Sequence, residues 1–127
     1  DDSGICIDAL NGGPGINSKK YLESDNKTSS VLNRIIDVVK NKNKHKAFFE
    51  TSICLTLNID KQLFFTGRVY GKISLKIKGK NGFGYDPIFI PNGMGLTFGE
   101  MSLRQKNLLS HRAIAIKKLS KYLTNSI

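Results

Sequence analysis

The sequence has few cysteines and no long apolar run, and each shortage excludes a class of protein. Two cysteines among 127 residues are too few for a disulfide-stapled scaffold, and they form no cluster with histidine at zinc-binding spacing. No apolar stretch approaches the roughly 18 residues that span a bilayer, and no signal segment opens the sequence. We therefore expect one cytoplasmic domain with no membrane segment.

Arginine is scarce beside lysine. Sixteen of the twenty basic residues are lysine, and ten acidic residues leave a formal net charge of +10. Bidentate contacts to phosphates and base edges favour arginine, so we interpret most of this charge as a solubilising lysine surface. A basic nucleic-acid-binding module remains an alternative, and its affinity would fall linearly with salt on a logarithmic scale. We expect no specific nucleic-acid partner.

Apolar periodicity predicts an α/β fold. Helical spacing over 31–39 predicts an amphipathic helix with one buried face, and a shorter helix is expected at 18–21. Period-two alternation over 47–59 and again over 63–78 predicts two strands, joined by a tight turn at Asp60-Lys61 into a long antiparallel hairpin. A short strand is expected at 88–90.

Two further helices are expected near the end of the sequence. Ser102 and Gln105 have the spacing of a capping box, and Ser110 can cap the helix that follows. In that last helix we expect Ile116, Leu119 and Leu123 to form the buried stripe.

Three clusters could carry chemistry, and the first is the pair Asp1 and Asp2. Adjacent carboxylates suit Mg²⁺, which takes one or two protein carboxylates together with substrate phosphates. A carboxylate can also position or deprotonate an attacking water. The alternative is a pair of solvated acids at the end of the chain.

The second cluster is the glycine-rich loop 81–87. Gly82 and Gly84 flank Phe83, so its ring could stand clear of the backbone and stack on a flat ligand. Asp86 could accept a hydrogen bond from a base edge. Equally, the segment could be a hairpin turn in which Phe83 fills the core.

The third cluster consists of Lys106, Ser110, His111 and Arg112. The last two lie in the first turn of a predicted helix, where free N–H groups attract anions and polar acceptors. An arginine there opposes the helix dipole, so a capping role explains it poorly. The alternative is a solvated basic face.

Taken together, these clusters resemble the inosine/xanthosine triphosphate pyrophosphatase family, enzymes that remove aberrant purine nucleotides such as ITP, dITP and XTP. The resemblance extends from residue 1 to about residue 120. The segments that carry it are Asp1–Ile5, Asp8–Gly15, Gly82–Phe89, Thr97–Met101, Lys106 and Ser110–Arg112.

The resemblance implies an α/β fold with a long twisted mixed β-sheet, flanking helices and two lobes, usually in a homodimer. It implies Mg²⁺-dependent hydrolysis of a purine nucleoside triphosphate to the monophosphate and pyrophosphate. By similarity, Asp2 is the catalytic and metal-binding carboxylate. The residues that contact substrate by similarity are Ser3, Phe83, Gly84, Tyr85, Asp86, Lys106, His111 and Arg112.

The sequence departs from the family at its start. The family's N-terminal strand and helix, with a Ser/Thr-x-Asn-x-x-Lys phosphate-binding motif, have no counterpart here. We therefore expect residues 1–127 to be the C-terminal portion of one such domain, and a catalytically inactive remnant is an alternative. Lys19-Lys20 also stands where the family often has arginine.

Overall fold

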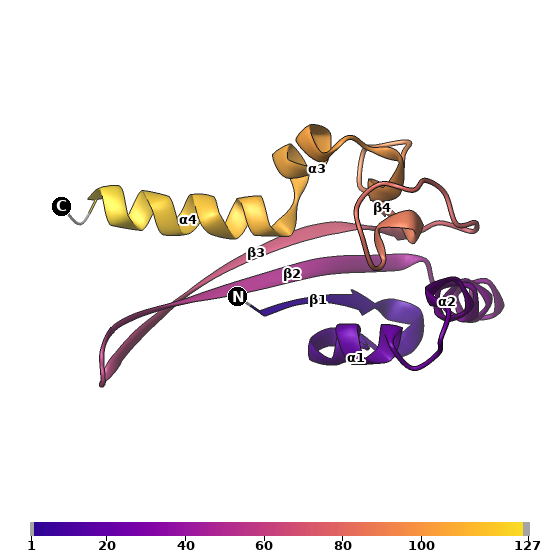
Figure 1. The fold of residues 1–127 in the computed structure, drawn as a ribbon, viewed down its shortest axis with the longest axis horizontal. Helices are drawn as coiled ribbons and strands as arrows, with labels where there is room; N and C mark the ends of the chain where they lie inside the picture. Colours follow the sequence, from indigo (N-terminus) through magenta and orange to yellow (C-terminus); the bar gives the residue numbers. More distant parts are fainter. Residues whose placement is uncertain (1, 126–127) are drawn as a thin grey trace.

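The computed structural model describes residues 2–125, which fold around one four-stranded antiparallel sheet (Figure 1). The strand order is β1-β2-β3-β4, and all three neighbouring pairs are antiparallel. The predicted α/β class with a long twisted sheet is confirmed, but the sheet within residues 2–125 is antiparallel throughout rather than mixed. The strands are β1 (Asp2–Ile7), β2 (Lys46–Asn58), β3 (Lys61–Ile73) and β4 (Phe89–Pro91). The helices are α1 (Ser18–Leu22), α2 (Thr28–Lys42), α3 (Leu103–Leu109) and α4 (His111–Asn125).

The hairpin of β2 and β3 is the longest feature of the molecule (Figure 1). Its pairing runs from Lys46 opposite Lys72 to Asn58 opposite Lys61, which confirms the predicted hairpin. The tight turn lies at Ile59 and Asp60, one residue before the predicted Asp60-Lys61, because Lys61 already pairs with Asn58. The predicted buried face, however, is confined to the first half of β2. Near the tip Ile59 is 98% exposed, because the hairpin curves away from α4 before it ends (Figure 1).

The second strand of the hairpin ends earlier than its alternation predicts. Residues up to 78 continue the period of two, yet β3 stops at Ile73. The hydroxyl of Ser74 donates to the Lys76 carbonyl at 2.7 Å and accepts from the Lys76 amide at 3.3 Å. Such local side-chain bonds give the backbone an alternative to a strand ladder, so the chain turns here.

The apolar face of α2 packs into the core as predicted. Val31, Ile35 and Val39 are fully buried, together with Ile5 and Ile7 of β1. The helix ends where Asn43 adopts the left-handed conformation, with φ of 52°. No helix within residues 2–125 has the length and apolar character needed to cross a bilayer.

The predicted core stripe of α4 is wrong. Ile116 is 55% exposed and Leu123 is 46% exposed, whereas His111 and Ala115 are buried. The reason is a close backbone approach: α4 crosses β3 at Gly67, where there is no side chain to hold it away. Small residues therefore decide which face of the helix packs inward.

This contact predicts that Gly67→Ala destabilises the fold. A Cβ at position 67 would overlap the His111 carbonyl oxygen and lie 2.6 Å from the Ala115 amide nitrogen, both backbone atoms that cannot rotate away. We expect a loss of about 1–3 kcal/mol in the free energy of unfolding, measured by urea denaturation.

The matched control is Gly95→Ala, since a Cβ there meets no atom within 4 Å. It should change the free energy of unfolding by less than about 0.5 kcal/mol. Equal effects of the two substitutions would show that α4 does not depend on this approach.

Candidate functional site

A cavity of about 360 Å³ opens between β1, α1, the loop 83–86, the middle of α3 and the start of α4. All eight residues predicted to contact substrate line it, although they are spread over 110 positions of the sequence, from Ser3 to Arg112. The structure therefore brings the predicted set together. The predicted lining residues are Ser3, Phe83, Gly84, Tyr85, Asp86, Lys106, His111 and Arg112.

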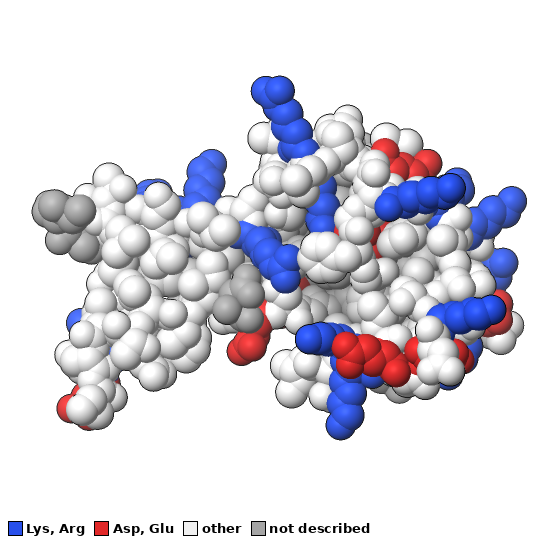
Figure 2. All heavy atoms as spheres, in the orientation of Figure 1, with Lys and Arg blue, Asp and Glu red and all other residues white. Residues whose placement is uncertain are grey.

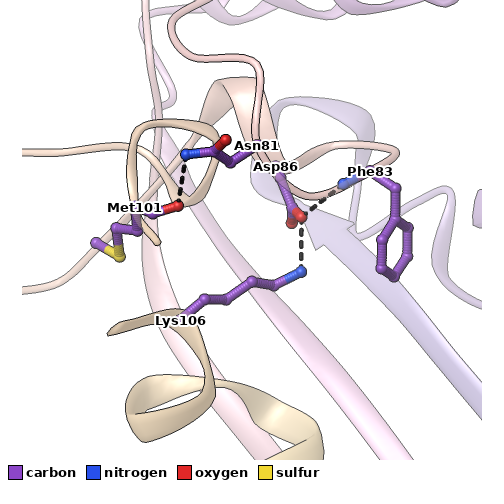
Figure 3. A network of polar contacts seen from close by, with 5 residues as sticks. All are labelled: Asn81, Phe83, Asp86, Met101 and Lys106. Carbon is purple, nitrogen blue, oxygen red and sulfur yellow. Dashed lines mark hydrogen bonds and ion pairs between the residues drawn. The ribbon is translucent and has the colours of Figure 1, made fainter. Parts of the chain in front are cut away.

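Asp86 organises the glycine-rich loop (Figure 3). Its Oδ2 accepts a hydrogen bond from the Phe83 amide at 3.0 Å and forms a buried ion pair with Lys106 Nζ at 2.6 Å. Gly82 adopts φ of 72°, and a Cβ there would overlap this same carboxylate oxygen. Only glycine therefore lets the loop curl around Asp86.

The capping of the neighbouring segments holds this loop in place. Asn81 Nδ2 donates to the Met101 carbonyl at 3.0 Å (Figure 3). The predicted capping box is confirmed, since Gln105 N–H donates to Ser102 Oγ at 3.1 Å and the Ser102 amide donates back to Gln105 Oε1 at 2.9 Å. This box starts α3 and so places Lys106 beneath the loop.

Phe83 does not fill the core. Its side chain is 64% exposed. The alternative in which Phe83 fills the core of a hairpin turn is therefore wrong, and the ring stands clear of the backbone. Two cations lie against the ring: Lys106 Nζ is 4.6 Å from its centroid, and Arg112 Cζ is 5.5 Å away. The ring is therefore a solvent-facing platform in a cationic setting.

Tyr85 ties the loop to α1. Its hydroxyl donates to the Ser18 carbonyl at 2.5 Å, and burial raises the pKa of Tyr85, so the phenol stays neutral. Ser18 in turn fixes β1, because its Oγ accepts from the Ile5 amide at 2.9 Å. Tyr85 acts in this way as a structural link in the cavity wall.

His111 is a buried, neutral imidazole at the back of the cavity. It stacks on Phe49 with ring centroids 4.9 Å apart and planes 11° apart. Burial, and then the charges of Arg112 and Lys106, lower the pKa of His111 to about 4. Its Nδ1 is buried without a hydrogen-bond partner among the described residues. Buried polar atoms rarely lack a partner, so this nitrogen marks a position that a ligand group could satisfy.

Asp2 lies apart from this cluster, at the exposed start of β1. It lines a second cavity of about 480 Å³ together with Glu50 and Ser52 of β2. Ser3 and Gly4 line both cavities, so the two are adjacent. The other half of the predicted carboxylate pair, Asp1, lies outside the described residues.

The donor set around Asp2 is compatible with Mg²⁺. No group of three or more histidine, cysteine, aspartate or glutamate side chains gathers within residues 2–125. Magnesium does not require one, because it usually keeps several waters and binds one or two carboxylates plus substrate phosphates. Asp2 and Glu50, on the wall of one cavity, fit that requirement.

Sequence reasoning missed six lining residues of the first cavity, and two of them bring a charge and an aromatic ring to its wall, Lys19 and Phe49. The other four are Gly4, Ile5, Ser18 and Leu22. Lys19 drew notice only as part of a lysine pair, and nothing local distinguishes it from Lys20. Phe49 belongs to the predicted inward face of its strand, but its role beneath His111 depends on where α4 crosses the sheet.

The buried ion pair predicts a large cost for Asp86→Asn. This change removes the charge that compensates the Lys106 ammonium in a site where both side chains are nearly inaccessible. We expect the free energy of unfolding to fall by about 3 kcal/mol or more. Urea denaturation monitored by circular dichroism measures it.

Glu50→Gln is the matched control, because it breaks the ion pair with Arg68 at 3.2 Å, where both side chains are partly exposed. Its cost should stay under about 1 kcal/mol. If both variants were equally stable, the Asp86–Lys106 pair would not anchor the loop.

Comparisons with known proteins agree with this geometry. A model of the Ham1 family matches residues 1–122. A dITP/XTP pyrophosphatase of Flavobacterium johnsoniae is 40% identical over 98% of this chain and 64% of its own length. One from Prochlorococcus marinus strain SARG is 42% identical over 94% of this chain and 58% of its own.

Solved structures give the same picture. The Staphylococcus aureus Ham1 protein superposes with a TM-score of 0.90 at 33% identity, covering 99% of this chain and 66% of that one. A HAM1 protein from Coxiella burnetii gives 0.88 at 33% identity, covering 97% and 64%. The chain spans less than two thirds of the length of the curated relatives named above. The fold, the cavity and the matched residues together place this chain in the Ham1 family.

Proposed function

We propose that the first cavity binds the base of an aberrant purine nucleotide, and that the chain takes part in hydrolysing dITP, ITP and XTP to the monophosphate and pyrophosphate. The observation that carries the proposal is the cavity itself, which combines an exposed aromatic ring with buried polar groups. Two relatives, named dITP/XTP pyrophosphatases, support the choice of substrate.

The side chains that line the first cavity have the chemistry needed to recognise a purine base. Phe83 offers a face on which a purine can stack, and Arg112 offers N–H donors. Hypoxanthine and xanthine carry a carbonyl at position 6, which accepts a hydrogen bond, whereas adenine carries an amino group, which donates. A cavity lined with hydrogen-bond donors therefore pairs with the carbonyl of hypoxanthine or xanthine. With adenine, the donors of the cavity would face the donating amino group, and neither would have a partner.

The second cavity is the proposed place for the phosphates. A nucleotide with its base in the first cavity can pass Ser3 and Gly4, which line both, and extend toward Asp2. When bound there, Mg²⁺ would screen the negative charge of the triphosphate. The Asp2 carboxylate would orient and deprotonate the water whose oxygen attacks the α-phosphorus, while the bond to the β-phosphate oxygen breaks and pyrophosphate leaves.

We also propose a homodimer that acts on the nucleotide pool of the cytoplasm. Large apolar side chains are exposed on the hairpin and on α4, and exposed apolar surface is a feature of sites that contact another protein. These side chains are Leu57, Ile59, Phe64, Ile116 and Leu123. The two cysteines are free thiols, which fits a reducing compartment such as the cytoplasm.

The face of the molecule drawn in Figure 2 does not favour the nucleic-acid alternative. Figure 2 shows lysine and arginine side chains scattered over one face, with acidic side chains among them and no continuous basic stripe. A backbone-tracking nucleic-acid groove needs such a stripe.

Base recognition predicts that the chain binds inosine monophosphate more tightly than adenosine monophosphate, by about tenfold or more in calorimetric Kd. Arg112→Ala should narrow that preference, because it removes donors from the wall. Arg104→Ala, on the exposed face of α3, is the control and should leave the preference unchanged. A preference that survives in Arg112→Ala would show that Arg112 does not read the base.

Catalysis is tested in a chimera in which this chain replaces the region that it matches in the Flavobacterium johnsoniae relative. We expect pyrophosphate release from dITP, and a loss of about 10²-fold or more in turnover for Asp2→Asn, which keeps the shape but removes the charge. Asp60→Asn, at the hairpin tip, should retain turnover. Near-parent activity of Asp2→Asn at saturating Mg²⁺ would exclude Asp2 as the catalytic carboxylate.

A further inference from the structure

Ser3 lies at the junction of the two cavities, because it lines both of them. In β1 it stands directly opposite Thr51 of β2, and side chains directly opposite each other in a sheet point to the same face. The Ser3 Oγ and Thr51 Oγ1 atoms are 2.8 Å apart, a good hydrogen-bond distance for two hydroxyls. A nucleotide that extends from one cavity to the other therefore passes a serine whose side chain a second hydroxyl already holds.

Thr51 is closed off from solvent and from both of these cavities. It is fully buried and is not among the lining residues of either cavity. On its other side it pairs with Gly67, where the backbone of α4 passes close by. Within residues 2–125, the hydrogen-bond partner of the Thr51 hydroxyl is Ser3 Oγ. Thr51 can thus affect a ligand in these cavities only through Ser3.

The burial of Thr51 decides which of the two hydroxyls donates. Each hydroxyl carries one proton and can also accept. If Ser3 donated, the proton of Thr51 would have no acceptor in a site without solvent, and a buried donor without a partner is costly. If Thr51 donates, the proton of Ser3 turns toward the cavities, where this partly exposed side chain meets solvent or a ligand. Donation from Thr51 to Ser3 is therefore the arrangement of lower energy.

The backbone around Ser3 is held on both edges of β1. On one edge the Ile5 amide donates to Ser18 Oγ at 2.9 Å, and Ser18 Oγ donates to the Gly15 carbonyl at 2.6 Å. A Cβ at Gly4 would overlap that same carbonyl, so β1 lies directly against the turn before α1. The other edge pairs with β2 along the whole strand. Rotation of its side chain is therefore the main freedom left to Ser3.

A serine that donates into the cavities suits the acceptor oxygens of a nucleotide, most of which lie on its phosphate. A hydrogen bond from a hydroxyl to an ionised oxygen is shorter and stronger than one between neutral groups. If its proton were directed at Thr51, Ser3 could offer only lone pairs to the ligand, and these repel a phosphate oxygen. The direction of one hydrogen bond therefore decides whether Ser3 attracts or repels the nucleotide.

We propose that Thr51 is a positioning residue for nucleotide binding: its hydroxyl donates to Ser3 and so directs the Ser3 proton at an acceptor oxygen of the nucleotide. The inference rests on the proposed function, because it needs a nucleotide that passes Ser3. Thr51 itself does not touch the ligand, since it is fully buried.

The test separates the hydroxyl of Thr51 from its methyl group. Thr51→Val keeps the shape of the side chain and removes the hydroxyl, whereas Thr51→Ser keeps the hydroxyl and removes the methyl. Calorimetric Kd values for inosine monophosphate are measured on the 127-residue chain, and urea denaturation gives the stability of each variant. We expect Thr51→Val to weaken binding by about fivefold, the size of one lost hydrogen bond. Thr51→Ser should bind within about twofold of the parent even where the lost methyl lowers stability.

Thr51→Cys repeats the comparison if the valine variant does not fold. Cysteine has nearly the size of serine, but its thiol is a much weaker donor. It should therefore weaken binding relative to Thr51→Ser by about threefold or more. Equal affinity of the serine and cysteine variants would overturn the proposal.

A double-mutant cycle with Ser3→Ala shows whether Thr51 acts through Ser3. Ser3→Ala removes the group that Thr51 directs, so the addition of Thr51→Val should not lower the affinity further. Equal losses in the two backgrounds would show a merely structural effect and overturn the role of Thr51. Thr56→Val is the matched control, because Thr56 is an exposed threonine of the same strand, and it should leave Kd unchanged.

The remaining outcomes separate this inference from the proposed function. Parent affinity in Thr51→Val, or an equal loss in Thr51→Ser, would overturn the positioning role while leaving nucleotide binding intact. Failure of the parent chain to bind inosine monophosphate would overturn the proposed function itself, and this inference with it.

Discussion

The ion pair between Asp86 and Lys106 is the contact on which the site depends. A buried pair is a weak source of stability, because the cost of removing two charges from water offsets much of their attraction. The main effect of the Asp86–Lys106 pair is to fix the positions of the groups around it. It joins a loop to a helix that begins 17 residues later, and it sets the Phe83 amide, the Lys106 ammonium and the aromatic ring at fixed distances from one another. Without it, a loop rich in glycine would have many conformations of similar energy.

Close backbone contacts at glycine assemble the rest of the wall. At Gly4 a Cβ would overlap the Gly15 carbonyl, so β1 and the turn before α1 can touch only without a side chain. At Gly67 the same condition lets α4 lie against β3 and brings His111 over Phe49. The cavity is therefore bounded by elements that approach through backbone, and its shape depends on small residues far from the chemistry.

The sequence predicted the parts of the fold that periodicity and capping control. The helix over 31–39, the hairpin and the Ser102–Gln105 capping box are local patterns, and the structure has each of them. The family resemblance that the motifs carry also implied a set of residues, and these converge on one cavity. The inward face of α4 was missed because periodicity counts apolar residues, whereas Gly67 and Ala115 decided the contact.

The same limit applies within the site. Asp86 was expected to meet a base edge, but its partner Lys106 lies 20 residues further along, and no local pattern relates the two. Lys19 could not be told from Lys20, since both are exposed lysines on one short helix and only the fold turns one of them toward the cavity. Contacts between residues far apart in the sequence, rather than residue type, therefore decide whether a side chain in this site has a structural role or a binding role.

Charge in this protein acts through its placement. The net charge is +10, and on the face drawn in Figure 2 basic and acidic side chains are interspersed. Three cations nevertheless converge on one cavity, while Asp2 and Glu50 line the adjacent one. Burial, and then the charges of Arg112 and Lys106, lower the pKa of His111, so the imidazole meets a ligand as a neutral group with one donor and one acceptor. Fixed positive charge and neutral hydrogen-bonding capacity are thus combined in one wall, because His111 is buried beside two cations.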